Sequence, residues 1–315
     1  MKGEPAVVPR AEPRSYYGRP VIKRPAWTWE VPFYLFAGGL AGASAPLAFA
    51  AERAGNRELA RAGWACALAG LAASPPLLIA DLGRPERFLN MLRVFKVTSP
   101  MSVGAWLLNA MGAATTAAAV PALTGRELPG RRVAAPAAAL LGPPLATYTG
   151  VLLADTAVPV WHEARRELPF VFGASAAAAA GGATAMAVDP RHAAPARRVA
   201  VGGAVGVALA GTLMEHRLGA LAEPYRRGTP RVLSRASKAC VVGGAALMGL
   251  RGASGRAPAR AAGALLLAGS LLERWAVFRA GFASADDPRH TVGPQRERLR
   301  RVAADAADAA DEPDA

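Results

Sequence analysis

Ionisable side chains within long apolar runs are the first candidates for chemistry in this sequence. Asp155 ends one such run, and Glu215 with His216 ends another. Glu273 lies within a third run, beside Arg274, so the two side chains point to different faces of a helix. An ionisable group inside a membrane is costly and often serves function. We therefore take Asp155, Glu215, His216 and Glu273 as candidates for proton handling, with a structural role as the alternative for each.

Two tyrosines and one aspartate form a second set of candidates. Tyr34 and Tyr148 lie in apolar runs, and a buried phenol hydroxyl needs a hydrogen-bond partner. A position in the aromatic belt at the membrane interface is the alternative for each tyrosine. Asp81 ends an apolar run and is followed by Arg84, so a local ion pair or a helix-end cap is the alternative for this carboxylate.

Ligands for a resident redox cofactor are scarce. Of the 4 His, only one lies at the end of an apolar run, so the pair of histidines that a membrane haem needs is missing. The 2 Cys are far apart and form neither a CxxC pair nor a disulfide framework. Metal catalysis lacks ligands for the same reason. We predict no haem, no iron–sulfur cluster and no metal in this chain.

The composition indicates that these side chains lie in a lipid bilayer. The chain is 52% hydrophobic and 19% charged, and its charges cluster between long uncharged runs. The net charge of +14 raises the question of nucleic-acid binding. The basic residues occupy short gaps between apolar runs, however, and form no stripe interleaved with aromatic residues. Arg-rich loops of a membrane protein explain the charge more simply, so no nucleic-acid partner is expected.

About eight runs are long enough to cross the membrane as helices, because a span needs about 20 apolar residues and satisfies its backbone internally. The fold class is therefore all-α, an integral membrane bundle of about eight transmembrane helices. The seventh run is the weakest, since its uncharged part is short and ends at Arg251. The expected spans are 31–51, 62–81, 99–121, 133–155, 168–187, 199–216, 236–250 and 259–279.

The chain divides into three parts. Residues 1–30 form a basic N-terminal segment, residues 31–283 the transmembrane domain, and residues 284–315 a tail that is first basic and then rich in Ala and Asp. The Ala/Asp repeat predicts disorder. The termini and the loops after the second, fourth and sixth spans hold about twice as many Lys and Arg as the other loops. This bias predicts a multi-pass protein of the cell membrane with both termini in the cytoplasm.

The loop after the second span is too amphipathic to be a passive connection. Phe88 and Phe95 alternate with Arg87, Arg93 and Lys96. Such a segment lies at the membrane interface or docks a partner subunit. In the first span, Gly38 and Gly42 form a small-xxx-small face suited to close helix packing.

Several motifs taken together resemble the NrfD/polysulfide reductase membrane-subunit family. They cover the first four spans and the loop described above, whereas the second half is supported mainly by helix number and by Arg274. The motifs are Tyr16–Pro20 through Trp27 and Trp29, Gly38–Gly42, Asp81–Pro85 with Arg87 and Phe88, Ser99–Ser102 with Gly104 and Trp106, and Tyr148–Leu153 with Pro159 and Trp161.

The resemblance implies a subunit that binds a quinone, either menaquinone or ubiquinone, and has no catalytic residue of its own. It implies quinone contacts from the first and fourth spans, at Tyr34 and Tyr148. Some relatives carry His at the first of these positions, so the Tyr of this chain changes the hydrogen bonding there. Asp81 and Arg84 are implied to lie at the mouth of the pocket.

The implied partners are an iron–sulfur electron-transfer subunit and a molybdopterin oxidoreductase subunit. Well-known relatives face these partners toward the outside of the membrane. In this chain the docking loop shares a face with the termini, so the charge bias predicts a cytoplasmic partner, such as a formate dehydrogenase-like enzyme.

Two other functions fit part of the pattern. A secondary transporter or permease is compatible with eight helices and intramembrane acids, but the halves show no clear repeat and no paired broken helices. A purely structural membrane anchor recruits a soluble enzyme through the basic loop without contacting a quinone. Sequence alone leaves both alternatives open.

Overall fold

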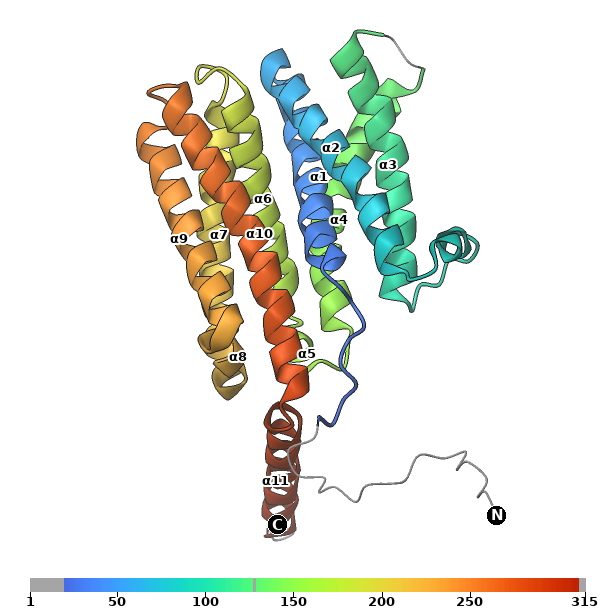
Figure 1. The fold of residues 1–315 in the computed structure, drawn as a ribbon, viewed down its shortest axis with the longest axis vertical. Helices are drawn as coiled ribbons and strands as arrows, with labels where there is room; N and C mark the ends of the chain where they lie inside the picture. The colour runs from blue at the N-terminus through green and yellow to red at the C-terminus, as the bar shows by residue number, and fades with distance from the viewer. Residues whose placement is uncertain (1–19, 127–128, 312–315) are drawn as a thin grey trace, which may run out of the picture.

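The computed structural model describes residues 20–126 and 129–311, and these residues form helices and no strand. Eight long helices make one bundle (Figure 1), which confirms the predicted all-α membrane architecture. They are α1 (Glu30–Arg53), α2 (Arg57–Asp81), α3 (Pro100–Thr124), α4 (Arg131–Ala154), α6 (Leu168–Ala187), α7 (Ala194–Leu218), α9 (Gly228–Arg251) and α10 (Arg256–Asp286). Shorter elements are η1 (Pro85–Leu92), α5 (Pro159–Glu163), η2 (Gly219–Ala222) and α8 (Glu223–Arg226), and α11 (Arg289–Asp311) ends the described chain.

Within the described residues, 7 helices are long and apolar enough to cross a membrane. The eighth member of the bundle, α9, falls short of this standard, in line with the weak seventh run of the sequence. It begins at Gly228, well before the expected residue 236. Its first turns carry the charged residues Arg231 and Arg235, so the apolar run from which the start was predicted begins later than the helix. These residues lie near the end of the bundle where charge can reach water.

Several helices begin before their apolar runs do. α2 starts at Arg57 rather than at residue 62, because the Asn56 side chain caps it by accepting a hydrogen bond from the Leu59 N–H (3.1 Å). Glu58 in the first turn complements the positive end of the helix dipole. Hydropathy identifies only the apolar part of such a helix, so the predicted first residue of the helix lies after the observed one.

The bundle consists of two four-helix halves. Helices α1 to α4 form one half, and α6, α7, α9 and α10 form the other, with α1 and α6 side by side at the junction (Figure 1). In the first half α1 crosses α4 at Gly42, where a Cβ would lie 2.5 Å from the Gly142 carbonyl oxygen and 2.8 Å from the Ala146 nitrogen. Only glycine permits this approach. The predicted small-residue face therefore includes the crossing point.

An aromatic cluster ties the N-terminal segment to the second half. Trp27 stacks on Trp161 of α5, with ring centroids 5.7 Å apart. The Trp161 indole donates to the Val277 carbonyl (2.8 Å) and contacts Phe278 and Phe282 of α10. These rings close the end of the bundle that bears the termini.

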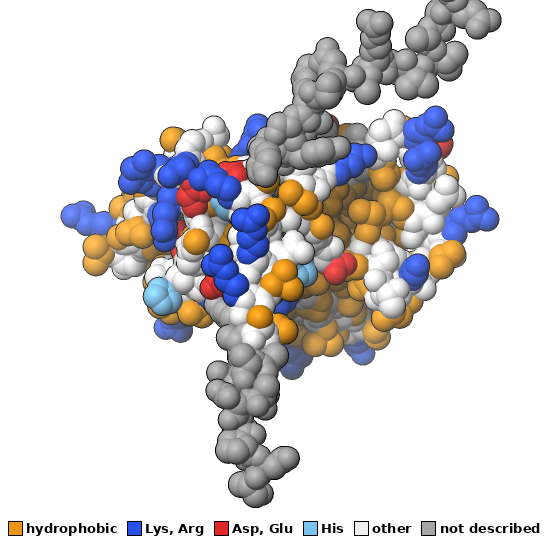
Figure 2. Space-filling model, turned by 90° about the horizontal axis from the view of Figure 1, so that it is seen from below, with side chains coloured by type: hydrophobic (Ala, Val, Ile, Leu, Met, Phe, Trp, Pro, Cys, Tyr) orange, Lys and Arg blue, Asp and Glu red, His pale blue; other side chains and the backbone are white. Residues whose placement is uncertain are grey.

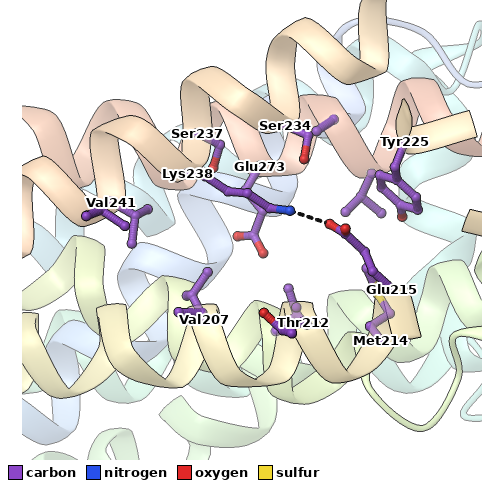
Figure 3. Close-up of a pocket in the computed structure, with 16 residues that line it drawn as sticks. Val207, Thr212, Met214, Glu215, Tyr225, Ser234, Ser237, Lys238, Val241 and Glu273 are labelled. Atoms are coloured by element: carbon purple, nitrogen blue, oxygen red, sulfur yellow. Dashed lines mark hydrogen bonds and ion pairs between the residues drawn. The ribbon is translucent and has the colours of Figure 1, made fainter. Parts of the chain in front are cut away.

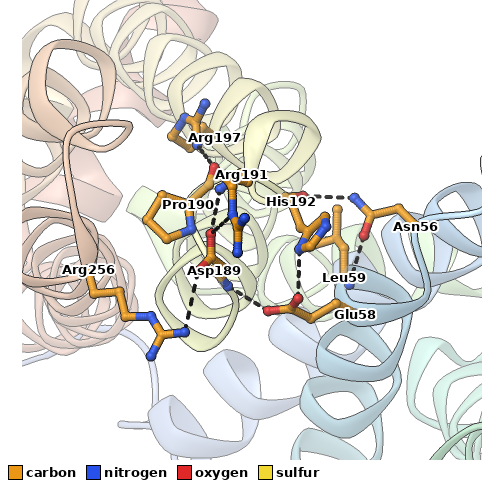
Figure 4. A network of polar contacts seen from close by, with 9 residues as sticks. All are labelled: Asn56, Glu58, Leu59, Asp189, Pro190, Arg191, His192, Arg197 and Arg256. Carbon is orange, nitrogen blue, oxygen red and sulfur yellow. Dashed lines mark hydrogen bonds and ion pairs between the residues drawn. The ribbon is translucent and has the colours of Figure 1, made fainter.

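A polar network joins the two halves at the opposite end (Figure 4). The Glu58 carboxylate accepts from the Asp189 backbone N–H (2.6 Å) and lies 2.6 Å from His192 Nδ1. Asp189 in turn binds Arg191 (3.0 Å) and Arg256 (3.4 Å). Hydrogen bonds from the Arg191 backbone and guanidinium lower the pKa of Asp189 to about 2. One short loop thus links the beginnings of α2 and α10.

The described part of the C-terminal tail is helical. Residues 289–311 form α11, which includes part of the Ala/Asp repeat. Alanine has the highest helix propensity, which explains how this polar segment continues as a helix. At its start, Arg289 lowers the pKa of Asp287 to about 2, and His290 Nε2 lies 2.9 Å from Glu223 of α8. Residues 312–315 lie outside the described part of the chain.

The end of the bundle with the termini also carries η1, α5, η2 and α8 (Figure 1). Figure 2 looks onto this end, where many Lys and Arg side chains and fewer acidic ones surround apolar patches. The predicted segment at residues 1–30 is described only from residue 20, so most of the Tyr16–Pro20 motif lies outside the structure.

Candidate functional site

Tyr34 and Tyr148 meet inside the first half of the bundle. Tyr34 lies in the first turns of α1 and is 2% exposed, whereas Tyr148 lies on α4 and is partly buried. The two side chains interact and line one cavity. The fold thus brings the two phenols to one place, although they lie on different helices.

Asp81 lies at the mouth of the same site. Its carboxylate accepts hydrogen bonds from the Thr28 backbone N–H (3.0 Å) and from the Thr28 hydroxyl (3.1 Å). Arg84 is exposed and does not line the site, so the local ion pair considered for these two residues is replaced by a contact with the N-terminal segment. Asp81 thus joins the tyrosines, whereas Arg84 does not.

A small apolar cavity of about 60 Å³ connects these three side chains. Its wall combines α1, α2, α3 and α4 with η1, which contributes Phe88 and Met91. Since η1 has no fully buried residue, it is a loosely packed part of this wall. The cavity is lined by Trp27, Val31, Tyr34, Leu78, Asp81, Leu82, Phe88, Met91, Met101, Ala105, Leu108, Asn109, Tyr148 and Leu152.

Gly104 of α3 makes room for the Tyr148 ring. A Cβ at this position would overlap the Tyr148 Cζ and hydroxyl oxygen. By contrast, Gly112 on the same helix has open space around the corresponding position. The absence of a side chain at Gly104 therefore sets where the Tyr148 hydroxyl lies.

The predicted docking residues divide into two groups. Phe88 is partly buried in the cavity wall, whereas Arg87, Arg93 and Lys96 are exposed. Phe95 is 57% exposed and rests edge-on against Trp106 of α3, with ring centroids 6.2 Å apart. The exposed members therefore form an outer surface over the cavity.

The four predicted proton-handling residues do not all come together, since only Glu215 and Glu273 line one cavity. Asp155 and His216 are exposed at the terminus-bearing end, whereas Glu215 pairs with Lys238 of α9 (2.6 Å). Glu273 is buried inside the second half and lines a different cavity from that of the tyrosines.

Arg274, beside Glu273, is fully buried. Its guanidinium donates to Glu273 Oε2 (3.1 Å) and to the Phe172 carbonyl (2.8 Å), and it lies 3.8 Å from the centre of the Phe172 ring. A Cβ at Gly39 of α1 would lie 3.4 Å from the same guanidinium. Both members of the Glu273–Arg274 pair thus face protein rather than lipid.

Sequence reasoning missed three contributors to the site. Thr28 binds Asp81 from 53 positions away in the chain. Asn109 and Met91 line the cavity, from α3 and η1 respectively. Asn109 could have been predicted from the sequence, since a polar side chain within an apolar membrane helix is a candidate for a functional site. Thr28 carried none, because its partner is set by the fold of the N-terminal segment.

This arrangement combines hydroxyl donors, one carboxylate and apolar walls in a site near the membrane interface. Such a site suits a flat, apolar molecule that carries oxygen acceptors. The phenols can donate hydrogen bonds to these oxygens, and the carboxylate can exchange protons with the molecule.

Comparison with known proteins gives the site a context. No curated protein matches the chain. The family model for polysulphide reductase NrfD matches residues 21–214, which is more than half of the chain and includes Tyr34, Asp81 and Tyr148. The resemblance seen in the sequence is thereby confirmed. This multi-pass membrane protein belongs to the NrfD polysulphide reductase family.

Proposed function

We propose that this chain is the quinone-binding membrane subunit of an oxidoreductase complex. In this proposal it passes electrons between the quinone pool and an iron–sulfur partner, which is paired with a molybdopterin catalytic subunit. The observation that carries the proposal is the convergence of Tyr34, Tyr148 and Asp81 on one apolar cavity beneath η1. Membership in the NrfD family supports a place in a complex of this kind.

The donor set fits a quinone head group. Menaquinone or ubiquinone, when bound, supplies the two-electron redox chemistry, and the protein supplies binding and electrostatics. The hydroxyls of Tyr34 and Tyr148 donate hydrogen bonds to carbonyl oxygens. Asp81 exchanges protons at its carboxylate, where Thr28 already holds it by two hydrogen bonds.

Binding requires the cavity to widen. Its volume of about 60 Å³ is far below the roughly 300–1,000 Å³ of ordinary ligand pockets. The movable wall is η1, since Phe88 and Met91 line the cavity and η1 has no fully buried residue. A shift of this segment would open the site toward the terminus-bearing end.

The same segment presents the surface for the partner. Arg87, Arg93, Phe95 and Lys96 lie outside the cavity wall and carry both charge and an aromatic ring. Aromatic and arginine side chains are enriched at protein interfaces. The charge bias of the loops supports a cytoplasmic position for this face and for both termini. A reporter fused after Ala315 that is active only outside the cytoplasm would contradict this orientation.

The central test uses the purified complex with Tyr148→Phe and Asp81→Asn. We expect quinol-linked electron transfer to fall in both variants while the iron–sulfur signals of the partner remain, because assembly does not depend on either group. Thr147→Val is the matched control, since its hydroxyl bonds only the Pro143 and Pro144 carbonyls of its own helix. Normal turnover in both site variants would remove these residues from the mechanism.

Two further measurements separate the alternatives. A purely structural anchor predicts that electron transfer is insensitive to quinone-site inhibitors. A transporter predicts substrate uptake by the protein alone in liposomes. Either result would overturn the proposed function.

A further inference from the structure

The second half of the bundle contains a cavity of about 200 Å³ that the quinone proposal does not use (Figure 3). It lies between α7, α9 and α10. One side of the wall is apolar, with Val207, Val241 and Val277 among its residues. The other side is polar and includes Thr212, Ser234, Glu215, Lys238, Tyr225 and Glu273.

Two buried polar atoms at this cavity have no partner among the described residues. They are Glu273 Oε1 and the Tyr225 hydroxyl oxygen. The two residues are 8% and 6% exposed, respectively. Figure 3 shows the Glu273 carboxyl pointing into the space between α9 and α7. Buried polar groups are satisfied in nearly all proteins, so this pair indicates a hydrogen-bonding occupant.

Water is the occupant that the dimensions favour. A volume of about 200 Å³ is far above the roughly 10–15 Å³ that a single water needs, so the cavity has room for several. Water supplies both the donor that Glu273 Oε1 needs and the acceptor that the Tyr225 hydroxyl needs. A hydrocarbon chain would leave both atoms unpaired.

The cavity continues toward the terminus-bearing end. A second, more open cavity of about 390 Å³ shares four of its lining residues, Glu215, Tyr225, Ser234 and Lys238. Two of these shared residues form an ion pair, between Lys238 Nζ and Glu215 Oε1 (2.6 Å), which is the dashed line in Figure 3. Lys238 is 58% exposed on its side chain, so this pair lies at the entrance rather than in the core.

We propose that these cavities form a hydrated path along which Glu273 exchanges protons with the terminus-bearing side, with the Glu215–Lys238 pair at its entrance. In the exchange a proton passes from water to Glu273 Oε1, and the protonated carboxyl returns it by the same path. No electron transfer or further reactant is involved. The site lies in the other half of the bundle from Tyr34 and Tyr148, so it stands independently of the quinone proposal.

The charged and titratable groups that face Glu273 come from four helices. Arg274 lies on α10 itself and binds Glu273 Oε2. Lys238 lines the cavity from α9, Glu215 from α7 and Tyr225 from α8. Arg274 keeps one carboxylate oxygen engaged, which leaves Oε1 for exchange with water.

Infrared difference spectroscopy of the purified full-length protein at two pH values tests the exchange directly. We expect a carboxylic C=O band that changes with pH, shifts in D₂O and is lost in Glu273→Gln. Asp155→Asn, which removes an exposed carboxyl group at the terminus-bearing end of the bundle, should retain the band. A band that persists in Glu273→Gln, or the absence of any such band in the unaltered protein, would overturn the proposal.

Thr212→Val provides a second variant that keeps Glu273 in place. Removing this hydroxyl from the cavity wall should slow hydrogen–deuterium exchange of the band without abolishing it. An unchanged exchange rate would contradict a path past Thr212. This variant keeps the proposal testable if Glu273→Gln fails to fold.

Thiol labelling tests the entry side, in a background where the free Cys66 and Cys240 are replaced by Ser. A small charged thiol reagent should label Thr212→Cys from the terminus-bearing side alone. Ser270→Cys is the control that should stay unlabelled, since Ser270 is buried in a hydrogen bond with Ser175 (2.9 Å). Labelling of Thr212→Cys only by lipophilic reagents would show a cavity filled by hydrocarbon and would refute the path.

Discussion

Gly104→Ala is the sharpest perturbation of the proposed quinone site, because it adds one methyl group and removes no functional group. The added Cβ would overlap the Tyr148 Cζ and hydroxyl oxygen. Carbon atoms in contact normally stay about 3.5–4.0 Å apart. The Tyr148 ring must therefore turn or shift, which moves its hydroxyl away from Tyr34.

The size of the effect follows from this displacement. Loss of one hydrogen bond between Tyr148 and a bound quinone corresponds to about 0.5–1.5 kcal/mol. At about 1.4 kcal/mol per factor of ten, the Kd of a quinone analogue should rise roughly two- to twelve-fold. Overpacking adds a cost of about 1–3 kcal/mol to folding, which should appear separately as a lower melting temperature.

The assay is binding of a quinone analogue to the purified complex, with thermal unfolding measured in parallel. Gly112→Ala is the matched control on the same helix, because nothing lies near its added Cβ. The variants Gly104→Ala and Tyr148→Phe should be less than additive when combined, since both act through one hydroxyl. Full additivity, or unchanged binding in Gly104→Ala, would refute the role assigned to Tyr148.

Three further predictions concern the rest of the bundle. Arg274→Gln leaves a buried carboxylate without its cation and should destabilise the fold by about 3–5 kcal/mol, seen as a lower unfolding midpoint in detergent; an unchanged midpoint would count against the pairing. Gly42→Ala should destabilise by about 1–3 kcal/mol, whereas Gly38→Ala, whose nearest neighbour would be 3.7 Å away, should have little effect; equal effects would contradict the crossing geometry. The pKa of Asp189 is lowered to about 2, so its ionised form contributes stability above the unfolded pKa of about 3.9 and loses it as pH falls toward 2. The difference in melting temperature between wild type and Asp189→Asn should therefore stay constant from about pH 7 to about pH 5, and a loss of that difference within this range would be inconsistent with the lowered pKa.

The helices could be predicted from the sequence because a membrane span must be both long and apolar. This constraint located all eight long helices of the bundle, including α9, whose run is the weakest. It failed at helix ends, where charged residues such as Arg57 and Arg231 continue the helix beyond its apolar part. In the tail, polarity predicts disorder whereas the helix propensity of alanine favours the helix α11.

The candidate site was predictable only in part. Tyr34 and Tyr148 stood out as phenols inside apolar runs, and the family resemblance paired them. The binding of Asp81 by Thr28 was hidden, since it depends on how residues 20–29 fold back over the bundle. The size of the cavity was hidden as well, because a volume depends on packing rather than on the order of residues.

The second half is more than the Ala-rich scaffold that its sequence indicates, and Arg274 shows why. A guanidinium with no exposed surface is expensive to bury, and hydrophobic side chains of similar volume often stabilise a core equally well. Its contacts extend in two directions, to Glu273 at the hydrated cavity and to Phe172 of α6 at the junction of the halves. It also lies against Gly39 of α1, little more than one turn from Tyr34. A change of charge at Glu273 therefore acts on a side chain that contacts both the proposed proton path and the helix of the proposed quinone site.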